Sequence, residues 1–129
     1  MKKLIVFILF FFTLRAYAPE LNCFYIFQIV VNYDPLIKAV NIVEVGDGND
    51  LYNEVENAVG WFQIRQIRVE DYNKRRGTNY KLEDFYDYEL SKEMFLYYAK
   101  GKTFEQAAKD WNGSGPKTID YWNLVKARL

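Results

Sequence analysis

The stretch DPLIKAVNIVEVGDG, residues 34–48, decides how the chain folds. Asp34 followed by Pro35 predicts the start of a helix, with Asp34 as the N-cap and Pro35 at the first helical position, where the missing amide hydrogen is not needed. Ile37 and Val40 repeat at helical spacing, and the Gly-Asp-Gly run ends the pattern. We therefore expect a helix that continues up to the first of these glycines.

Glu44 continues the apolar stripe of this helix, because it follows Ile37 by seven residues and Val40 by four. Its carboxyl is therefore expected to face the core or the wall of a cleft. Burial raises the pKa of a carboxyl, and a glutamic acid that is still protonated near neutral pH can act as a general acid. The alternative is a glutamate at the helix end that bends out to solvent.

The amino-acid composition limits the kinds of catalytic site that Glu44 could belong to. The 129 residues include no histidine and one cysteine. This excludes Ser-His-Asp and Cys-His catalysis, the HExxH zinc site and any imidazole proton shuttle. Acid–base chemistry at neutral pH must then use carboxylates, lysines, tyrosines or the thiol, after burial or neighbours have shifted their pKa values. No intramolecular disulfide can form, and the length suits one domain.

The first 18 residues have the layout of a secretory signal peptide. Lys2 and Lys3 precede an apolar run over residues 4–12, and a small-x-small pattern closes the segment at residues 16–18. The apolar run is about half of the ~20 residues that a membrane-spanning helix needs. We therefore expect an exported protein that is periplasmic, membrane-associated or extracellular.

Retention of this segment as an N-terminal membrane anchor is the alternative. Pro19 would hinder cleavage after Ala18, and a second apolar stretch follows at residues 24–31. Cys23 stands where a lipid could be attached, but Asn22 replaces the small residue expected before such a site. A buried thiol is therefore the stronger interpretation of Cys23.

The charge balance argues against nucleic acid as a partner. The chain has 17 basic and 17 acidic side chains, and removal of residues 1–18 leaves 14 basic and 17 acidic ones. Nucleic-acid binding relies on a clustered positive field. We therefore expect no nucleic-acid partner for the slightly acidic domain that remains.

Residues 24–129 are predicted to form one mainly α-helical domain, since they show no linker, repeat or shift in composition. Residues 46–60 are polar and turn-rich, which predicts a loop or a short hairpin. Helical spacing predicts further helices near residues 64–76, 89–100, 103–111 and 119–129. The inward residues expected from this spacing include Ile64, Ile67, Tyr72, Tyr97, Tyr98, Trp111, Ile119, Val125 and Leu129. No segment alternates convincingly with period two, so little or no β-sheet is expected.

Two further segments contain amides that could bind a polar ligand. Gln63 stands among the apolar residues of GWFQI, residues 60–64, and a buried amide needs partners such as a sugar hydroxyl or acetamido group. Asn112 begins the segment NGSGP, residues 112–116, which ends a helix. Ordinary packing of Gln63 and a backbone cap by Asn112 are the alternatives.

The order of these features resembles the lysozyme-like domain of lytic transglycosylases and goose-type lysozymes. In that family the glutamate is usually written E-S, and it is followed by G-L-M-Q or G-x-x-Q-I, by A-Y-N-x-G and by a tyrosine in the last helix. The matching stretches here are Val43–Val45, Ala58–Ile64, Asp110–Gly113 and Ile119–Trp122. The resemblance covers the chain from Asp34 to Leu129.

The chain departs from the family pattern at three positions. Val45 replaces the usual serine, Trp111 the usual tyrosine and Asp110 the usual alanine. Loss of the serine removes a hydroxyl that would help to position the acid or the substrate. Trp61 and Trp111 are expected either to stack on sugar faces or to belong to the core.

The resemblance implies a lysozyme-like α+β fold in which a helical bundle surrounds a substrate cleft. Glu44 would be the catalytic acid and base, and the substrate would be the β-1,4 bond between N-acetylmuramic acid and N-acetylglucosamine in peptidoglycan. The residues implied to bind substrate are Gln63, Asn112, Tyr121, Gly60, Phe62 and Trp111. No metal or other cofactor is implied, and a monomer acting on glycan strands is expected.

The sequence is compatible with three functions of such a domain. A substrate-assisted route would give 1,6-anhydro products, because the N-acetyl oxygen of the sugar replaces a second carboxylate. A hydrolytic muramidase would use water, which could be positioned by Asp47, Asp50, Glu54 or Glu56. From a different class, the same fold could serve as a non-catalytic cell-wall-binding or apparatus-anchoring module.

Overall fold

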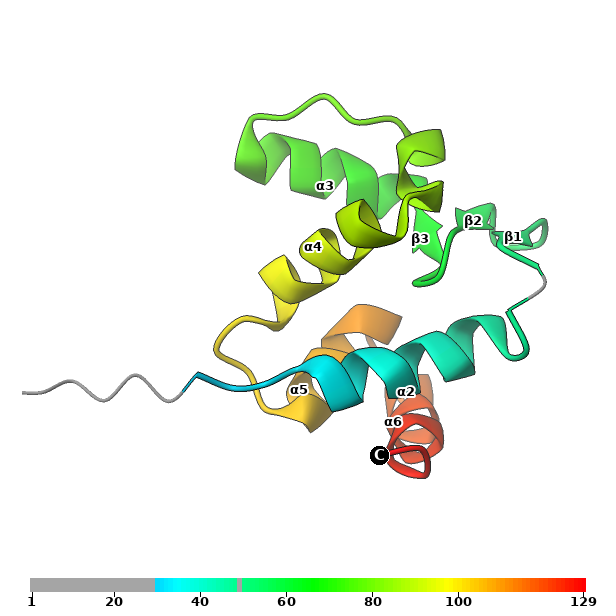
Figure 1. Ribbon diagram of the computed structural model, residues 1–129, viewed down its shortest axis with the longest axis vertical. Helices are drawn as coiled ribbons and strands as arrows, with labels where there is room; N and C mark the ends of the chain where they lie inside the picture. Colours follow the sequence, from blue (N-terminus) through cyan, green and yellow to red (C-terminus); the bar gives the residue numbers. More distant parts are fainter. Residues whose placement is uncertain (1–29, 49) are drawn as a thin grey trace, which may run out of the picture. The chain divides into compact units, whose positions relative to one another are not determined.

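Helix α2 (Asp34–Val45) forms where the sequence predicts it, but its first turn is capped differently (Figure 1). Tyr33, not Asp34, occupies the N-cap position. Asn32 supplies the side-chain acceptor instead, since its Oδ1 accepts a hydrogen bond of 2.9 Å from the Asp34 amide. The helix ends at Gly46, whose φ of 60° lies in the region that glycine tolerates best.

The computed structural model describes residues 30–48 and 50–129. The predicted signal peptide or anchor over residues 1–18 and the predicted buried thiol of Cys23 lie outside these residues. Within the described part of the chain, no helix is both long enough and apolar enough to cross a membrane.

Most of the described chain is helical. After α2 come the helices α3 (Gln66–Arg76), η1 (Leu82–Tyr86), α4 (Tyr88–Ala99), α5 (Phe104–Asn112) and α6 (Lys117–Lys126). Thr103 caps α5, because its hydroxyl accepts a hydrogen bond from the Gln106 amide. The Gln106 side chain does not complete a capping box with Thr103, since it donates to Asp110 instead.

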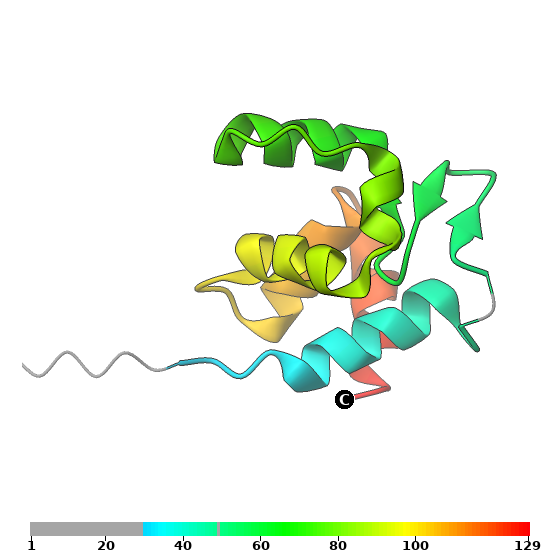
Figure 2. The ribbon, with the colours of Figure 1, turned by 45° about the horizontal axis from the view of Figure 1, so that its top comes forward.

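A small antiparallel sheet has two strands in the segment predicted as a loop or hairpin, residues 46–60, and its third strand at the predicted start of the next helix. Its strands β1 (Tyr52–Asn53), β2 (Ala58–Val59) and β3 (Ile64–Arg65) pair in sequence order. Tyr52 lies opposite Val59, and Ala58 lies opposite Arg65. The expectation of a mainly α domain with little sheet is confirmed. Figures 1 and 2 show the sheet beside the C-terminal end of α2.

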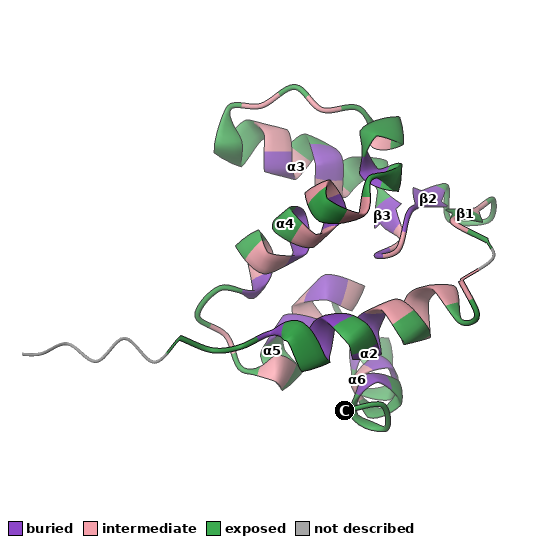
Figure 3. Cartoon of the chain, viewed as in Figure 1, coloured by how far each residue is buried: buried purple, intermediate pink, exposed green. Residues whose placement is uncertain are grey.

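The core lies where α2 packs on α5 and α6 and where α4 packs on α5. Figure 3 shows buried residues on each of the helices α2 to α6. The fully buried large side chains include Leu36, Val40, Phe62, Ile64, Val69, Tyr72, Phe85, Met94, Phe95 and Val125.

Several predicted inward positions are wrong. Ile67 is 73% exposed, and Tyr97, Ile119 and Leu129 are exposed as well. The predicted helix begins at Ile64, but Ile64 belongs to β3, so the helical periodicity counted from it is out of phase with α3. The inward face of α3 instead carries Val69 and Tyr72, three residues apart.

Gly60 allows the chain to turn between β2 and β3. Its φ is 73°, and a Cβ at this position would lie 2.2 Å from the carbonyl oxygen of Phe85. The Gly60 amide donates to the carbonyl of Leu51, and its carbonyl accepts from the Gln63 amide. The turn that presents Gln63 therefore requires a residue without a side chain at position 60.

Replacement of Gly60 by alanine is expected to lower the free energy of unfolding by about 3 kcal/mol or more. The left-handed backbone alone costs about 1–2 kcal/mol, and overpacking against Phe85 adds about 1–3 kcal/mol. Gly77→Ala is the matched control, because Gly77 has a φ of 67° but open space around its Cα. Urea unfolding of both variants checks this prediction, and equal losses of stability would contradict it.

Candidate active site

Glu44 lies in the last turn of α2 and bonds to a residue of α6. The Tyr121 hydroxyl donates to Glu44 Oε1 over 2.6 Å, across 77 positions of sequence. Tyr121 is buried, and Glu44 is partly buried. The prediction that the Glu44 carboxyl faces inward is confirmed, and the alternative of a carboxyl bent out to solvent is wrong.

The surroundings of Glu44 raise the pKa of its carboxyl from an ordinary 4.5 to about 7. Burial is the main cause, because it removes water from the charged form, and the nearby charge of Glu56 adds to it. The hydrogen bond from Tyr121 opposes the rise most strongly, followed by the positive charges of Arg65 and Arg68. The carboxyl can therefore both give and accept a proton near neutral pH.

Tyr121 acts toward Glu44 as a fixed hydrogen-bond donor. Burial raises the pKa of the Tyr121 hydroxyl, and the adjacent Glu44 carboxylate raises that pKa further. The hydroxyl therefore keeps its proton throughout the pH range in which Glu44 titrates. Tyr121 can hold the orientation of Glu44 in both of its protonation states.

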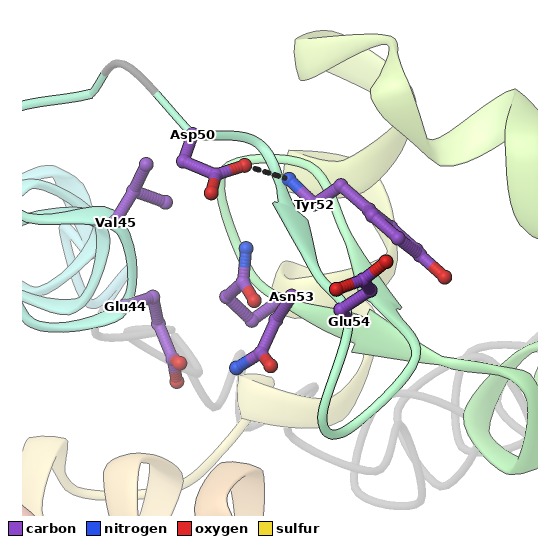
Figure 4. A pocket seen from close by; sticks show the side chains of 7 residues that line it. Glu44, Val45, Asp50, Tyr52, Asn53 and Glu54 are labelled. Atoms are coloured by element: carbon purple, nitrogen blue, oxygen red, sulfur yellow. Dashed lines mark hydrogen bonds between the residues drawn. The ribbon is translucent and has the colours of Figure 1, made fainter.

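A cleft of about 420 Å³ opens beside Glu44. Its lining residues are Glu44, Val45, Asp50, Tyr52, Asn53, Glu54 and Gln63. Figure 4 shows Glu44 and Val45 on one side, at the end of α2, and Asp50, Tyr52, Asn53 and Glu54 on the other. The Asp50 carboxylate accepts a hydrogen bond of 3.0 Å from the Tyr52 amide, which ties the loop after α2 to β1.

A smaller polar cavity, of about 40 Å³, brings the two predicted amides to Glu44. Gln63 and Asn112 both line it together with Glu44. Gln63 has a φ of 47°, and its Nε2 donates to the Gly60 carbonyl over 3.1 Å. The structure thus gathers Glu44, Gln63, Asn112 and Tyr121, which the sequence had proposed as separate site residues.

Gly60 and Phe62 lie in the packed interior next to the site, whereas Trp111 lines the polar cavity together with Glu44. Phe62 is fully buried, and Trp111 is only 5% exposed. The Trp111 indole donates from Nε1 to the Phe62 carbonyl over 3.1 Å, and the Arg68 guanidinium lies over the ring at 4.3 Å. Trp61 packs edge-on against Tyr88 and lines a separate apolar groove.

Several residues at the site were not singled out by the sequence. Arg65 and Arg68 line the polar cavity, and Asn53 lines the cleft. The two arginines follow Gln63 by two and five residues, so their closeness to that amide was the available signal. Of the acidic residues expected near a catalytic water, Asp50 and Glu54 line the cleft.

Neither a metal-binding cluster in the described residues nor a similar protein of known function helps to interpret this site. Among residues 30–48 and 50–129, no group of three or more His, Cys, Asp or Glu side chains is arranged to hold a metal ion. No family model matches the chain, and no curated protein or solved structure matches it either. Any function must therefore be argued from the side chains that the fold brings together.

The raised pKa of Glu44 predicts a pH-dependent stability that Glu44→Gln should lack. The folded state binds the Glu44 proton more tightly than the unfolded state does. The resulting contribution to the free energy of unfolding is fully present below pH ~4.5 and is lost as the pH rises through about 7. Relative to Glu44→Gln, the wild-type protein should lose up to about 3 kcal/mol across this window.

Chemical unfolding at a series of pH values measures this difference. The carboxyls of Asp71 and Asp110 also have shifted pKa values, which are lowered by hydrogen bonds to Arg75 and Lys102. They are present in both proteins, so their effects cancel in the comparison. A difference that stays constant between pH 4 and pH 8 would show that the Glu44 pKa is not raised.

Proposed function

We propose that this protein is a peptidoglycan-cleaving glycosidase with a lysozyme-like fold and with Glu44 as its general acid and base. The proposal rests on the state of one carboxyl, that of Glu44. Glu44 has a pKa of about 7, lies in the wall of an open cleft and is held there by Tyr121. A carboxyl in this state suits protonation of a glycosidic oxygen near neutral pH.

In the first step, protonated Glu44 donates its proton to the glycosidic oxygen between N-acetylmuramic acid and N-acetylglucosamine. The bond between this oxygen and the anomeric carbon breaks, and positive charge develops on the sugar ring. Glu44 is then a carboxylate and can accept the proton of the incoming nucleophile in the second step. A pKa close to the working pH serves both steps.

The nucleophile distinguishes two forms of this reaction. In the substrate-assisted route, the N-acetyl oxygen stabilises the cation and the muramyl 6-hydroxyl attacks, which gives a 1,6-anhydro product. In the hydrolytic route, water attacks instead. The positions of Asp50 and Glu54 support the hydrolytic route as the alternative. Both carboxylates line the cleft with Glu44, and either could orient the attacking water.

Amide groups around the cleft supply the polar contacts that an N-acetylated sugar needs. Gln63 and Asn53 line the cleft, and Asn112 lines the adjoining polar cavity. Each amide offers donors and an acceptor to acetamido groups or hydroxyls. Val45, which replaces the serine of the resembled family, also lines the cleft and offers an apolar surface there.

The arrangement of elements supports the lysozyme-like part of the proposal. A helix that ends in the acidic residue is followed by a small antiparallel sheet and then by helices that pack against the first one. The resemblance in the sequence implies such a helical bundle around a cleft. A non-catalytic wall-binding module of the same fold would keep this architecture, so activity has to be measured.

The decisive assay is clearing of purified peptidoglycan, by turbidity or zymogram. Glu44→Gln is expected to lower the rate at least about 100-fold, because it removes the proton donor while keeping the side-chain shape. Glu89→Gln is the matched control, since Glu89 is exposed on α4 and away from the cleft. Full activity of Glu44→Gln would exclude the assignment, and wall binding without clearing by the wild type would favour the binding module.

Mass spectrometry of the released muropeptides completes this experiment by identifying the nucleophile. Anhydro ends indicate the substrate-assisted route, and reducing ends that carry added water indicate hydrolysis. If water is the nucleophile, Asp50→Asn and Glu54→Gln should differ in the rate of clearing. The substitution that lowers this rate identifies the carboxylate that orients the water.

The pH–rate profile should have a basic limb near pH 7, because Glu44 must be protonated for the first step. Tyr121→Phe is expected to move this limb to higher pH, since the hydrogen bond from Tyr121 lowers the pKa of Glu44. Tyr72→Phe serves as control, because the Tyr72 hydroxyl bonds to Glu93 and not to Glu44. A limb that moves to lower pH in Tyr121→Phe would contradict the assigned role of this hydrogen bond.

A further inference from the structure

Arg68 of α3 connects the end of α5 to the polar cavity that contains Glu44. Its Nη2 donates to the carbonyl of Trp111 over 2.8 Å and approaches the carbonyl of Asp110 at 3.4 Å. Its guanidinium carbon lies 4.3 Å from the centre of the Trp111 ring and 5.1 Å from that of Tyr98. One side chain therefore both stacks on the Trp111 indole and binds the backbone carbonyl of the same residue.

These contacts fix the residue that comes next in the chain. The last carbonyls of a helix have no partner within the helix, and a cation at this end is favourable. Arg68 satisfies two of these carbonyls from a different helix. Asn112 directly follows Trp111 and lines the polar cavity together with Glu44 and Arg68.

We propose that Arg68 is a positioning residue, which holds the Trp111–Asn112 end of α5 so that the Asn112 amide lies beside Glu44. The contribution of Arg68 to glycan cleavage rests on the proposed function, whereas the positioning of Asn112 by Arg68 does not. Arg68 needs no contact with substrate in this role. It acts through the backbone of α5 and the indole of Trp111.

Arg68 also contributes positive charge to the surroundings of Glu44. The charged and titratable groups that act on the Glu44 carboxyl are Tyr121 from α6, Glu56 from the turn before β2, Arg65 from β3 and Arg68 from α3. Removal of the Arg68 charge should raise the pKa of Glu44. This effect depends on charge, whereas the placement of Asn112 depends on the shape of the guanidinium, so the two can be separated.

Arg68→Met and Arg68→Lys test the proposal, with Arg76→Met as the matched control. Arg76 lies on the same helix and over the ring of Tyr97, at 5.6 Å, but away from the cleft. Three quantities are measured in each variant: the NMR signals of the Asn112 side-chain amide, the pKa of Glu44 from its ¹³C carboxyl shift, and kcat/KM on purified peptidoglycan.

Arg68→Met is expected to shift the Asn112 amide signals, raise the pKa of Glu44 and lower kcat/KM by about 10- to 100-fold, as displaced site groups commonly do. Arg68→Lys should return the pKa of Glu44 toward the wild-type value, because the charge is kept. It should leave the Asn112 signals and kcat/KM impaired, because an ammonium cannot stack on Trp111 as a planar guanidinium does. Arg76→Met should change none of the three.

Wild-type Asn112 signals and kcat/KM in Arg68→Lys would overturn the proposal, since charge alone would then be sufficient. This result decides the matter even if Arg68→Met does not fold. If the wild-type protein does not cleave peptidoglycan, the proposed function fails, but the Asn112 signals still test the placement. Unchanged Asn112 signals in both folded Arg68 variants would overturn the positioning role itself.

Discussion

The hydrogen bond between Tyr121 and the partly buried carboxyl of Glu44 is the interaction on which the candidate site depends. A carboxyl removed from water needs a hydrogen-bond partner, and Tyr121 supplies one at 2.6 Å. This bond joins the C-terminal end of α2 to α6, and the two helices also pack against each other. The helices thus fix the acid in one orientation, while the cleft beside it remains open to a ligand.

Core packing and site geometry are linked through adjacent residues. The Trp111 indole bonds to the Phe62 carbonyl, which ties the end of α5 to the turn before β3. Gln63 and Asn112 directly follow these two core residues in the chain. This buried contact acts together with Arg68 in placing Asn112, and it links both amide-bearing segments to the core.

The absence of histidine is compatible with this arrangement, since one glutamic acid can supply the titrating group. Burial and Glu56 raise its pKa, while Tyr121, Arg65 and Arg68 lower it. The resulting value of about 7 is a balance between these opposed effects. The composition had limited the chemistry to groups with shifted pKa values, and the structure identifies Glu44 as the buried carboxyl in the cleft wall.

The sequence by itself determined the helix of residues 34–45 and the inward direction of Glu44, because helical periodicity and capping act within a few residues. It misplaced Ile67, since Ile64 belongs to a strand whose pairing no local pattern showed. Only the tertiary structure decided the bond between Tyr121 and Glu44, the burial of Trp111 and the position of Arg68. These depend on contacts between segments 40 to 80 positions apart, and neither a long-range hydrogen bond nor the loss of water around a carboxyl is determined by local sequence.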